Sequence, residues 1–211
     1  MNWSIRSEIL GRPFFFTLNF SVHSNKLLSM RLLKKIIFLI ISLVTLTLIM
    51  GLFVEDEYSV TKTIIVERNS DDIFKYIKNL KNQSEYSAWE KTDPQMKKSY
   101  EGNDGEVGFV STWNSTNDDI GKGEMEIVKI EDGKRIDFKV RFKEPFEADS
   151  HAFINTEALG PNTTKVTWNF HGQVAYPMNM MLLFKDMESE IGPDLEVGLK
   201  NLKKLFESSE I

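Results

Sequence analysis

The stretch RIDFKVRFKEPFEADSHAFINTEALGPNTTKVTWNFHGQV, at residues 135–174, has the pattern of successive β-strands. Its first eight residues alternate charged with apolar side chains, as in a strand with one solvent-exposed and one buried face. The apolar members are Ile136, Phe138, Val140 and Phe142. Residues 148–159 and 163–174 follow as a hairpin around Gly160-Pro161-Asn162. Successive strands with turn residues between them predict an antiparallel sheet.

Upstream of this stretch the sequence predicts more strands and two helices. Residues 60–66, 107–114 and 123–130 are expected to be strands, because they are β-branched or alternate in polarity. Ser70 is expected to cap a helix with an apolar stripe at every third or fourth residue. A second, shorter helix is expected over residues 84–89.

Downstream, a long closing helix is expected over residues 179–207. Apolar residues recur there at spacings of three or four, which gives one continuous stripe. Gly192-Pro193 interrupts it, and since proline removes an intrahelical hydrogen bond, we expect a kink or a short break there.

Composition describes a globular chain and excludes several kinds of chemistry. The 211 residues are 41% hydrophobic and 27% charged, enough for one domain of about 150 residues and an additional segment. There is no cysteine and there are three histidines, so neither a disulfide nor a metal centre is expected. The net charge of −5 argues against nucleic acid as a partner. The glycines form no nucleotide-binding motif, and no cofactor is expected.

An uncharged segment divides the chain by charge. Ile36 to Phe53 holds 18 apolar or small residues, long enough to cross a bilayer. Up to Val54 the chain has six basic residues and one acid, whereas the remainder has 20 basic and 30 acidic residues. Under the positive-inside rule the N-terminus stays in the cytoplasm, and the following domain lies outside the cell (inner) membrane.

We therefore divide the chain into three parts. Residues 31–54 are expected to be an uncleaved transmembrane signal anchor. A cleaved signal peptide is the main alternative, but the apolar run is longer than usual and no small-residue cleavage site follows it. Residues 1–30 are expected to be a poorly ordered extension, from a start codon assigned too early, or a short interfacial segment. Residues 55–211 form the exported domain.

Several short motifs in residues 58–207 carry a family resemblance. They are Ser70-Asp71-Asp72-Ile73-Phe74, Trp89, Gly121-Lys122-Gly123, Thr164-Lys165-Val166-Thr167-Trp168, Gly192-Pro193-Asp194-Leu195 and Gly198-Leu199-Lys200-Asn201-Leu202-Lys203. With the element order of strand, two helices, six strands and long helix, the chain resembles the SRPBCC or START-like superfamily, in its polyketide cyclase-like branch. The resemblance implies an α+β helix-grip fold, a curved antiparallel sheet wrapped around a long C-terminal helix. Here one transmembrane helix precedes it.

Aromatic and methionine side chains are the candidates for ligand contact. The sheet is expected to contribute Phe109, Trp113, Met125, Phe138, Phe142, Trp168 and Phe170, and the helix Met180, Met181, Phe184 and Met187. The residues alone fit a tight core as well as a cavity. In the families that the chain resembles, sheet and helix enclose a pocket for lipids, sterols or polyketide-like molecules, which implies a cavity here. Its polar groups are expected from Ser111, Asn155 or His151.

Three functions follow from these expectations. The first is a membrane-anchored protein that binds a small hydrophobic ligand or lipid. The second is a cyclase or dehydratase-like enzyme in the same cavity, for which His151 is the weak catalytic candidate. The third is a module that binds another envelope protein. His171 is expected to face solvent, and the acids from Asp186 to Glu196 to form a solvated helix face rather than a calcium site.

Overall fold

The computed structural model describes residues 22–117, 119–145 and 147–208, which belong to two compact units, residues 1–47 and 48–211. The first unit holds most of helix α1 (Val22–Gly51). Within the described residues, only its segment Ser29–Gly51 is long and apolar enough to cross a membrane. The hydroxyl groups of Thr45 and Thr47 donate to backbone carbonyls one turn earlier, at 2.8 and 2.9 Å. The helix therefore satisfies these polar groups internally, as a helix in lipid must.

The start of α1 differs from the sequence expectation. A poorly ordered extension was expected up to residue 30, but the helix already begins at Val22. A helix propagates readily once it is nucleated, and residues 22–30 contain no proline or glycine to stop it. The rest of the expected extension, residues 1–21, lies outside the described residues.

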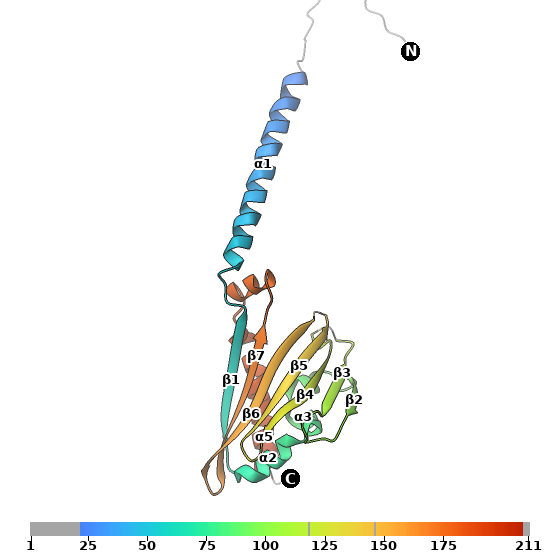
Figure 1. The fold of residues 1–211 in the computed structure, drawn as a ribbon, viewed down its shortest axis with the longest axis vertical. Helices are drawn as coiled ribbons and strands as arrows, with labels where there is room; N and C mark the ends of the chain where they lie inside the picture. Colours follow the sequence, from blue (N-terminus) through green and yellow to red (C-terminus); the bar gives the residue numbers. More distant parts are fainter. Residues whose placement is uncertain (1–21, 118, 146, 209–211) are drawn as a thin grey trace, which may run out of the picture. The chain divides into compact units, whose positions relative to one another are not determined.

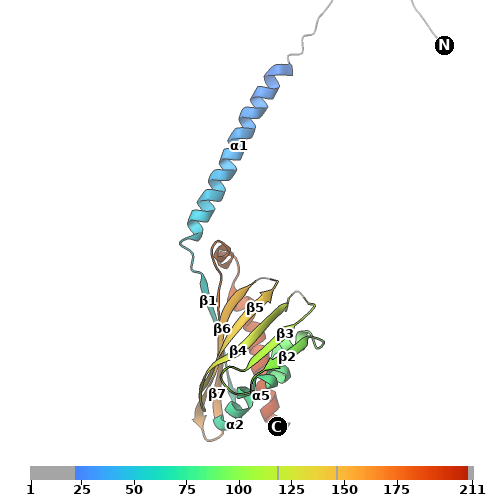
Figure 2. The same ribbon diagram turned by 45° about the vertical axis from the view of Figure 1, so that its right-hand side comes forward.

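The second unit is built on a seven-stranded antiparallel sheet in the order β1-β7-β6-β5-β4-β3-β2 (Figures 1 and 2). Its strands are β1 (Glu57–Val66), β2 (Lys97–Glu101), β3 (Val110–Asn114), β4 (Lys122–Glu131), β5 (Arg135–Glu144), β6 (Ala148–Gly160) and β7 (Thr163–Gln173). In both views the sheet is curved, and the long helix α5 (Met187–Glu207) lies against one face. The expected helix-grip fold is confirmed.

Alternation along the strands separates a buried face from a charged one. Ile136, Phe138 and Val140 of β5 are buried, as the period of two predicted. On the opposite face, the Arg141 guanidinium donates to Glu124 and Glu126 of β4 at 3.0 and 2.6 Å. Such cross-strand ion pairs stabilise the solvent-exposed face of a sheet modestly.

Helix α5 packs against β1 and β7 through the second half of its apolar stripe. Leu195, Leu199, Leu202 and Phe206 are buried there. Gly198 permits the close approach, because a Cβ at this position would lie 2.7 Å from the Trp168 ring. The Trp168 ring also meets Tyr86 and Trp89 edge to face, at centroid distances of 5.8 and 6.1 Å. Through these contacts α5, the sheet and the short helical segments that hold Tyr86 and Trp89 pack into one core.

Short helices connect β1 to β2 and close one end of the sheet. They are α2 (Ser70–Lys78), η1 (Leu80–Asn82), α3 (Gln83–Tyr86) and α4 (Ala88–Thr92). The expected N-cap at Ser70 is wrong by one residue. Asn69 caps α2, because its side-chain oxygen accepts a hydrogen bond from the backbone N–H of Asp71 at 2.8 Å. The expected second helix is two short helices separated by Ser87, and β2 lies in a range that was not assigned from sequence.

The expected closing helix over residues 179–207 is wrong in its first part. It is divided into a 3-10 helix, η2 (Met178–Leu183), and α5. The division has a local cause, since the Asp186 side chain accepts hydrogen bonds from Glu188 N and Ser189 Oγ and so begins a new helix. Conversely, α5 continues through Pro193 without the expected break. Pro193 removes one hydrogen bond, and the helix is held by the partly buried Ile191 before it and the buried Leu195 after it.

Candidate ligand cavity

A cavity of 210 Å³ lies between the concave face of the sheet, the helices α3 and α4, and the start of α5. Aromatic and aliphatic side chains make up most of its wall. The lining residues are Tyr58, Gln83, Ser87, Trp89, Glu90, Met96, Trp113, Asp119, Ile120, Met125, Val140, Phe142, Ala152, Trp168, Phe170 and Ile191. A mainly apolar wall with a few polar groups is the usual composition of a small-molecule site.

Five of the expected residues line this cavity. They come from four strands and are Trp113 of β3, Met125 of β4, Phe142 of β5, and Trp168 and Phe170 of β7. Phe142 lies between two other rings, meeting Trp113 edge to face at 5.8 Å and Phe170 at 6.4 Å. The indole N–H of Trp113 donates to the Ile120 carbonyl at 3.3 Å. The aromatic wall therefore presents carbon surface to the cavity.

The other six expected residues lie elsewhere. Phe109 and Phe138 are buried in the core rather than at the cavity, and Phe109 stacks on Tyr100. Met181 and Phe184 belong to η2 and the segment after it, not to α5, so neither reaches the cavity. Phe184 is 86% exposed. Met180 and Met187 also lie outside the lining. The helix expected over residues 179–207 is interrupted between η2 and α5.

The polar groups of the cavity come mostly from the short helices. Gln83 and Ser87 are buried, and the Gln83 amide donates to the Met125 sulfur at 3.7 Å. Glu90 also lines the cavity, and its carboxylate is paired with Lys98 of β2. A ligand here meets rings on the sheet side and polar groups on the α3–α4 side. Of this helical wall, only Trp89 belongs to the motifs that carry the family resemblance.

The expected polar groups lie away from the cavity. His151 of β6 is exposed on the opposite face of the sheet, where it pairs in register with His171 of β7. It therefore cannot be the base of an enzyme that works in the cavity. Ser111 is buried but not part of the lining, and Asn155 is not part of it either. His171 lies across the sheet from Trp168 and Phe170, as expected, with its Nε2 3.6 Å from a Glu57 oxygen.

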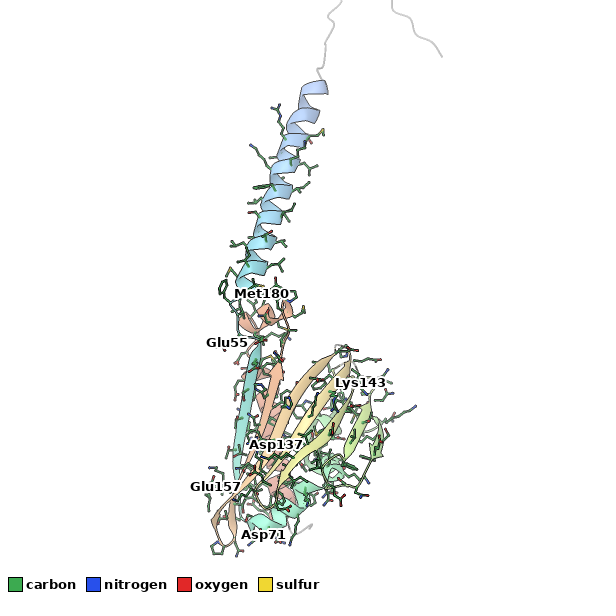
Figure 3. The ribbon with its side chains drawn as sticks, viewed as in Figure 1. Glu55, Asp71, Asp137, Lys143, Glu157 and Met180 are labelled. Carbon is green, nitrogen blue, oxygen red and sulfur yellow. The ribbon has the colours of Figure 1, made fainter. Side chains whose placement is uncertain are left out.

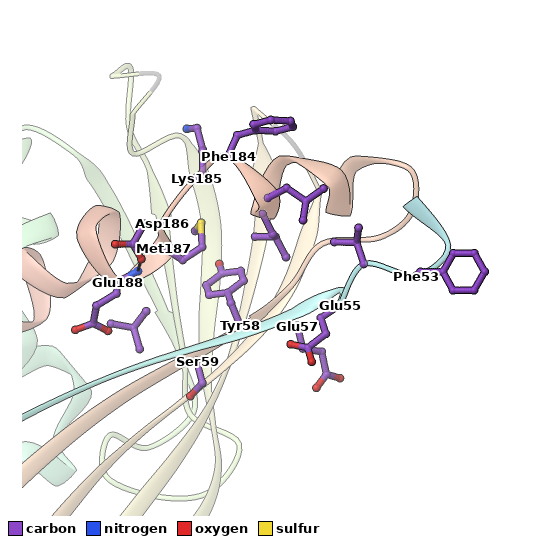
Figure 4. A pocket seen from close by; sticks show the side chains of 14 residues that line it. Phe53, Glu55, Glu57, Tyr58, Ser59, Phe184, Lys185, Asp186, Met187 and Glu188 are labelled. Atoms are coloured by element: carbon purple, nitrogen blue, oxygen red, sulfur yellow. Dashed lines mark hydrogen bonds between the residues drawn. The ribbon is translucent and has the colours of Figure 1, made fainter. Parts of the chain in front are cut away.

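A second hollow, of 740 Å³, opens to solvent where β1 begins (Figure 4). Its wall comes from residues 53–60 and 182–188. Tyr58 lines both this hollow and the inner cavity. Its ring stacks on Phe170 at 6.4 Å and covers Gly172, where a Cβ would lie 2.3 Å from the Tyr58 ring. Burial raises the pKa of the Tyr58 hydroxyl, which stays neutral.

The curved antiparallel sheet and the long helix α5 define a helix-grip domain, and an aromatic cavity lies between them. The chain belongs to the family described as polyketide cyclase / dehydrase and lipid transport, whose model matches residues 57–207. No curated protein matches the chain.

Similar solved structures include truncated norcoclaurine synthase from Thalictrum flavum. It is 13% identical, with a TM-score of 0.54, over 72% of this chain and 95% of that one. A major latex-like protein from Panax ginseng is 17% identical, with a TM-score of 0.53, over 72% and 98%. A protein from Nitrosospira multiformis is 16% identical, with a TM-score of 0.52, over 71% and 96%. At these identities the likeness concerns the fold alone.

Proposed function

We propose that the domain binds a small hydrophobic molecule or a lipid chain in the 210 Å³ cavity. The observation that carries this proposal is the set of aromatic rings, Trp113, Phe142, Trp168 and Phe170, that line one cavity. A site for a drug-sized ligand usually measures about 300–1,000 Å³. Because the cavity is smaller than this, we expect it to hold a single acyl chain or ring system of the ligand. Its polar group would face Gln83 and Ser87.

A fluorescence titration tests ligand binding. An environment-sensitive fatty-acid probe is expected to bind residues 55–211 with micromolar affinity or better, and to change the emission of the lining tryptophans. Ile191→Lys places a charge at the cavity from α5 and is expected to weaken binding. Val197→Lys, at an exposed position of the same helix, is the matched control. Met96→Lys gives a second cavity variant outside regular structure. Equal probe affinity in all four proteins would contradict the proposal.

We also propose that α1 anchors the domain, with the N-terminus in the cytoplasm and the domain on the far side of the membrane. The support is the length of the apolar segment, the basic residues Arg31, Lys34 and Lys35 before it and the acids Glu55, Asp56 and Glu57 after it. Alkaline phosphatase requires disulfides, which form only outside the bacterial cytoplasm. Fused after Ile211 in a Gram-negative host, it is expected to be active. An inactive fusion, with a cytoplasmic reporter active at the same position, would reverse the orientation.

An enzyme in the same cavity is the second candidate, and two acids in the wall favour it. Glu90 and Asp119 line the cavity, whereas His151 does not. A general acid or base must lie within hydrogen-bonding reach of the ligand, which Glu90 satisfies by position. If the domain is an enzyme, the Glu90→Gln variant should still bind the substrate but should no longer convert it to product. For a binding protein, the same variant changes neither the ligand nor its chemical form.

A further inference from the structure

A group of large apolar side chains is exposed at the end of the domain where β1 begins. Phe53 and Phe184 are 85% and 86% exposed, and both point away from the sheet (Figure 4). Leu52, Met178 and Leu183 are more than half exposed as well. We call Leu52, Phe53, Met178, Leu183 and Phe184 the apolar tip. All five belong to the unit of residues 48–211. So large an exposure of adjacent apolar residues marks an interaction surface.

One buried amide joins the two chain segments of the apolar tip. Asn179 is the only polar residue between Met178 and Phe184, and it is 2% exposed. Its Nδ2 donates to the backbone carbonyls of Gly51 and Val54, at 2.9 Å each. The side chain thus satisfies the carbonyl of the last residue of α1 and fastens η2 beside it. Because the only polar side chain of the η2 segment is turned inward, its outer surface is left apolar.

Charge is arranged in a second layer, on the domain side of the apolar tip. No residue from Tyr176 to Phe184 is charged. Glu55, Asp56 and Glu57 follow Phe53, while Lys185, Asp186 and Glu188 follow Phe184, and all six are exposed. Apolar residues beside the end of an apolar helix, followed by charged residues, match the change from acyl chains to water at a membrane surface.

We propose that the apolar tip is inserted into the interface of the bilayer that α1 crosses. The proposal rests on the proposed anchor, because the tip adjoins the last turn of that helix. Continuity with α1 favours lipid over a protein partner as the occupant. The carboxylates behind the tip favour zwitterionic over anionic headgroups. Insertion also brings the outer hollow to the membrane surface, since Phe53 and Phe184 line it. Tyr58 then separates lipid from the inner cavity.

Site-specific labels test the proposal in the full chain, which contains no cysteine of its own. Phe184→Cys, labelled with an environment-sensitive dye, reports on the apolar tip. Leu159→Cys is the matched control, an exposed leucine near the β6–β7 turn. Figure 3 shows Glu157 of the same strand at the end of the domain opposite Glu55 and Met180. Leu43→Cys reports on α1. All three proteins are reconstituted in phosphatidylcholine vesicles that contain a nitroxide-labelled lipid.

The proposal expects blue-shifted emission and nitroxide quenching at positions 184 and 43, and neither at position 159. Quenching at 43 alone would overturn the insertion of the tip while leaving the anchor intact, and would favour a protein partner for this surface. Loss of quenching at both positions would overturn the anchor as well as the tip. Ligand binding by the isolated domain does not depend on either result.

Discussion

Two neighbouring segments of this chain have the same apolar periodicity but opposite surroundings. Leu199 of α5 is 2% exposed and packs against the sheet, whereas Leu183 of η2 is 53% exposed. Both lie within residues 179–207, which the sequence predicts as one long helix. The difference lies in their polar neighbours, because Asp186 begins a new helix and Asn179 turns η2 back toward the end of α1. Periodicity therefore identifies an apolar face without identifying what covers it.

A matched pair of leucine substitutions should differ strongly in their effect on the free energy of unfolding. Leu199→Ala should lower the free energy of unfolding by about 2–5 kcal/mol, as for other buried leucines. Leu183→Ala should change it by less than about 0.5 kcal/mol, because an exposed side chain loses little packing. Denaturant unfolding of residues 55–211 measures both values. Similar losses of unfolding free energy in the two variants would show that η2 and α5 belong to one core, which would contradict the structure.

Removing the amide that fastens η2 gives an intermediate effect. Asn179→Ala leaves the Gly51 and Val54 carbonyls without this donor, so local opening of residues 178–184 should become easier by about 1–3 kcal/mol. Amide hydrogen exchange in residues 48–211 measures the opening. Asn162→Ala, in the exposed β6–β7 turn, should leave exchange in this segment unchanged. Unaltered exchange in the Asn179 variant would mean that other contacts hold η2 in place.

The smallest effect is expected at the wall between the two hollows. Tyr58→Ala should open a path from the outer hollow to the cavity, and so raise the association rate of a fatty-acid probe. An increase of up to about tenfold corresponds to about 1.4 kcal/mol in the barrier. Stopped-flow fluorescence measures the rate. Tyr100→Ala, which removes an aromatic ring that lines neither hollow, should leave the rate unchanged. Equal rates in the two variants would place the entrance elsewhere.

The sequence predicted the sheet more reliably than the site, for a physical reason. Alternation places Phe138 and Phe142 on the same face of β5, and the structure confirms it. Whether a side chain on that face meets a neighbour or an empty space depends on packing from distant elements. Phe142 borders the cavity while Phe138 is covered, and no local pattern distinguishes them.

The expected single helix over residues 179–207 is wrong because it follows the apolar spacing and ignores the capping residue. Asp186 precedes Glu188 and Glu190, and acids in a first turn are a helix-start signal that can be read from sequence. Gln83 and Ser87 gave no comparable signal. Both are buried polar residues of a short helical segment whose place over the sheet is set only by tertiary contacts.

Native mass spectrometry can show whether the aromatic cavity holds a hydrophobic molecule. The full chain, isolated from membranes in mild detergent, is expected to carry a hydrophobic compound at one molecule per chain. The compound should be lost from Ile191→Lys and retained in Val197→Lys, because only Ile191 lines the cavity. An empty chain, or the same compound retained equally in both variants, would show that the cavity does not hold a ligand.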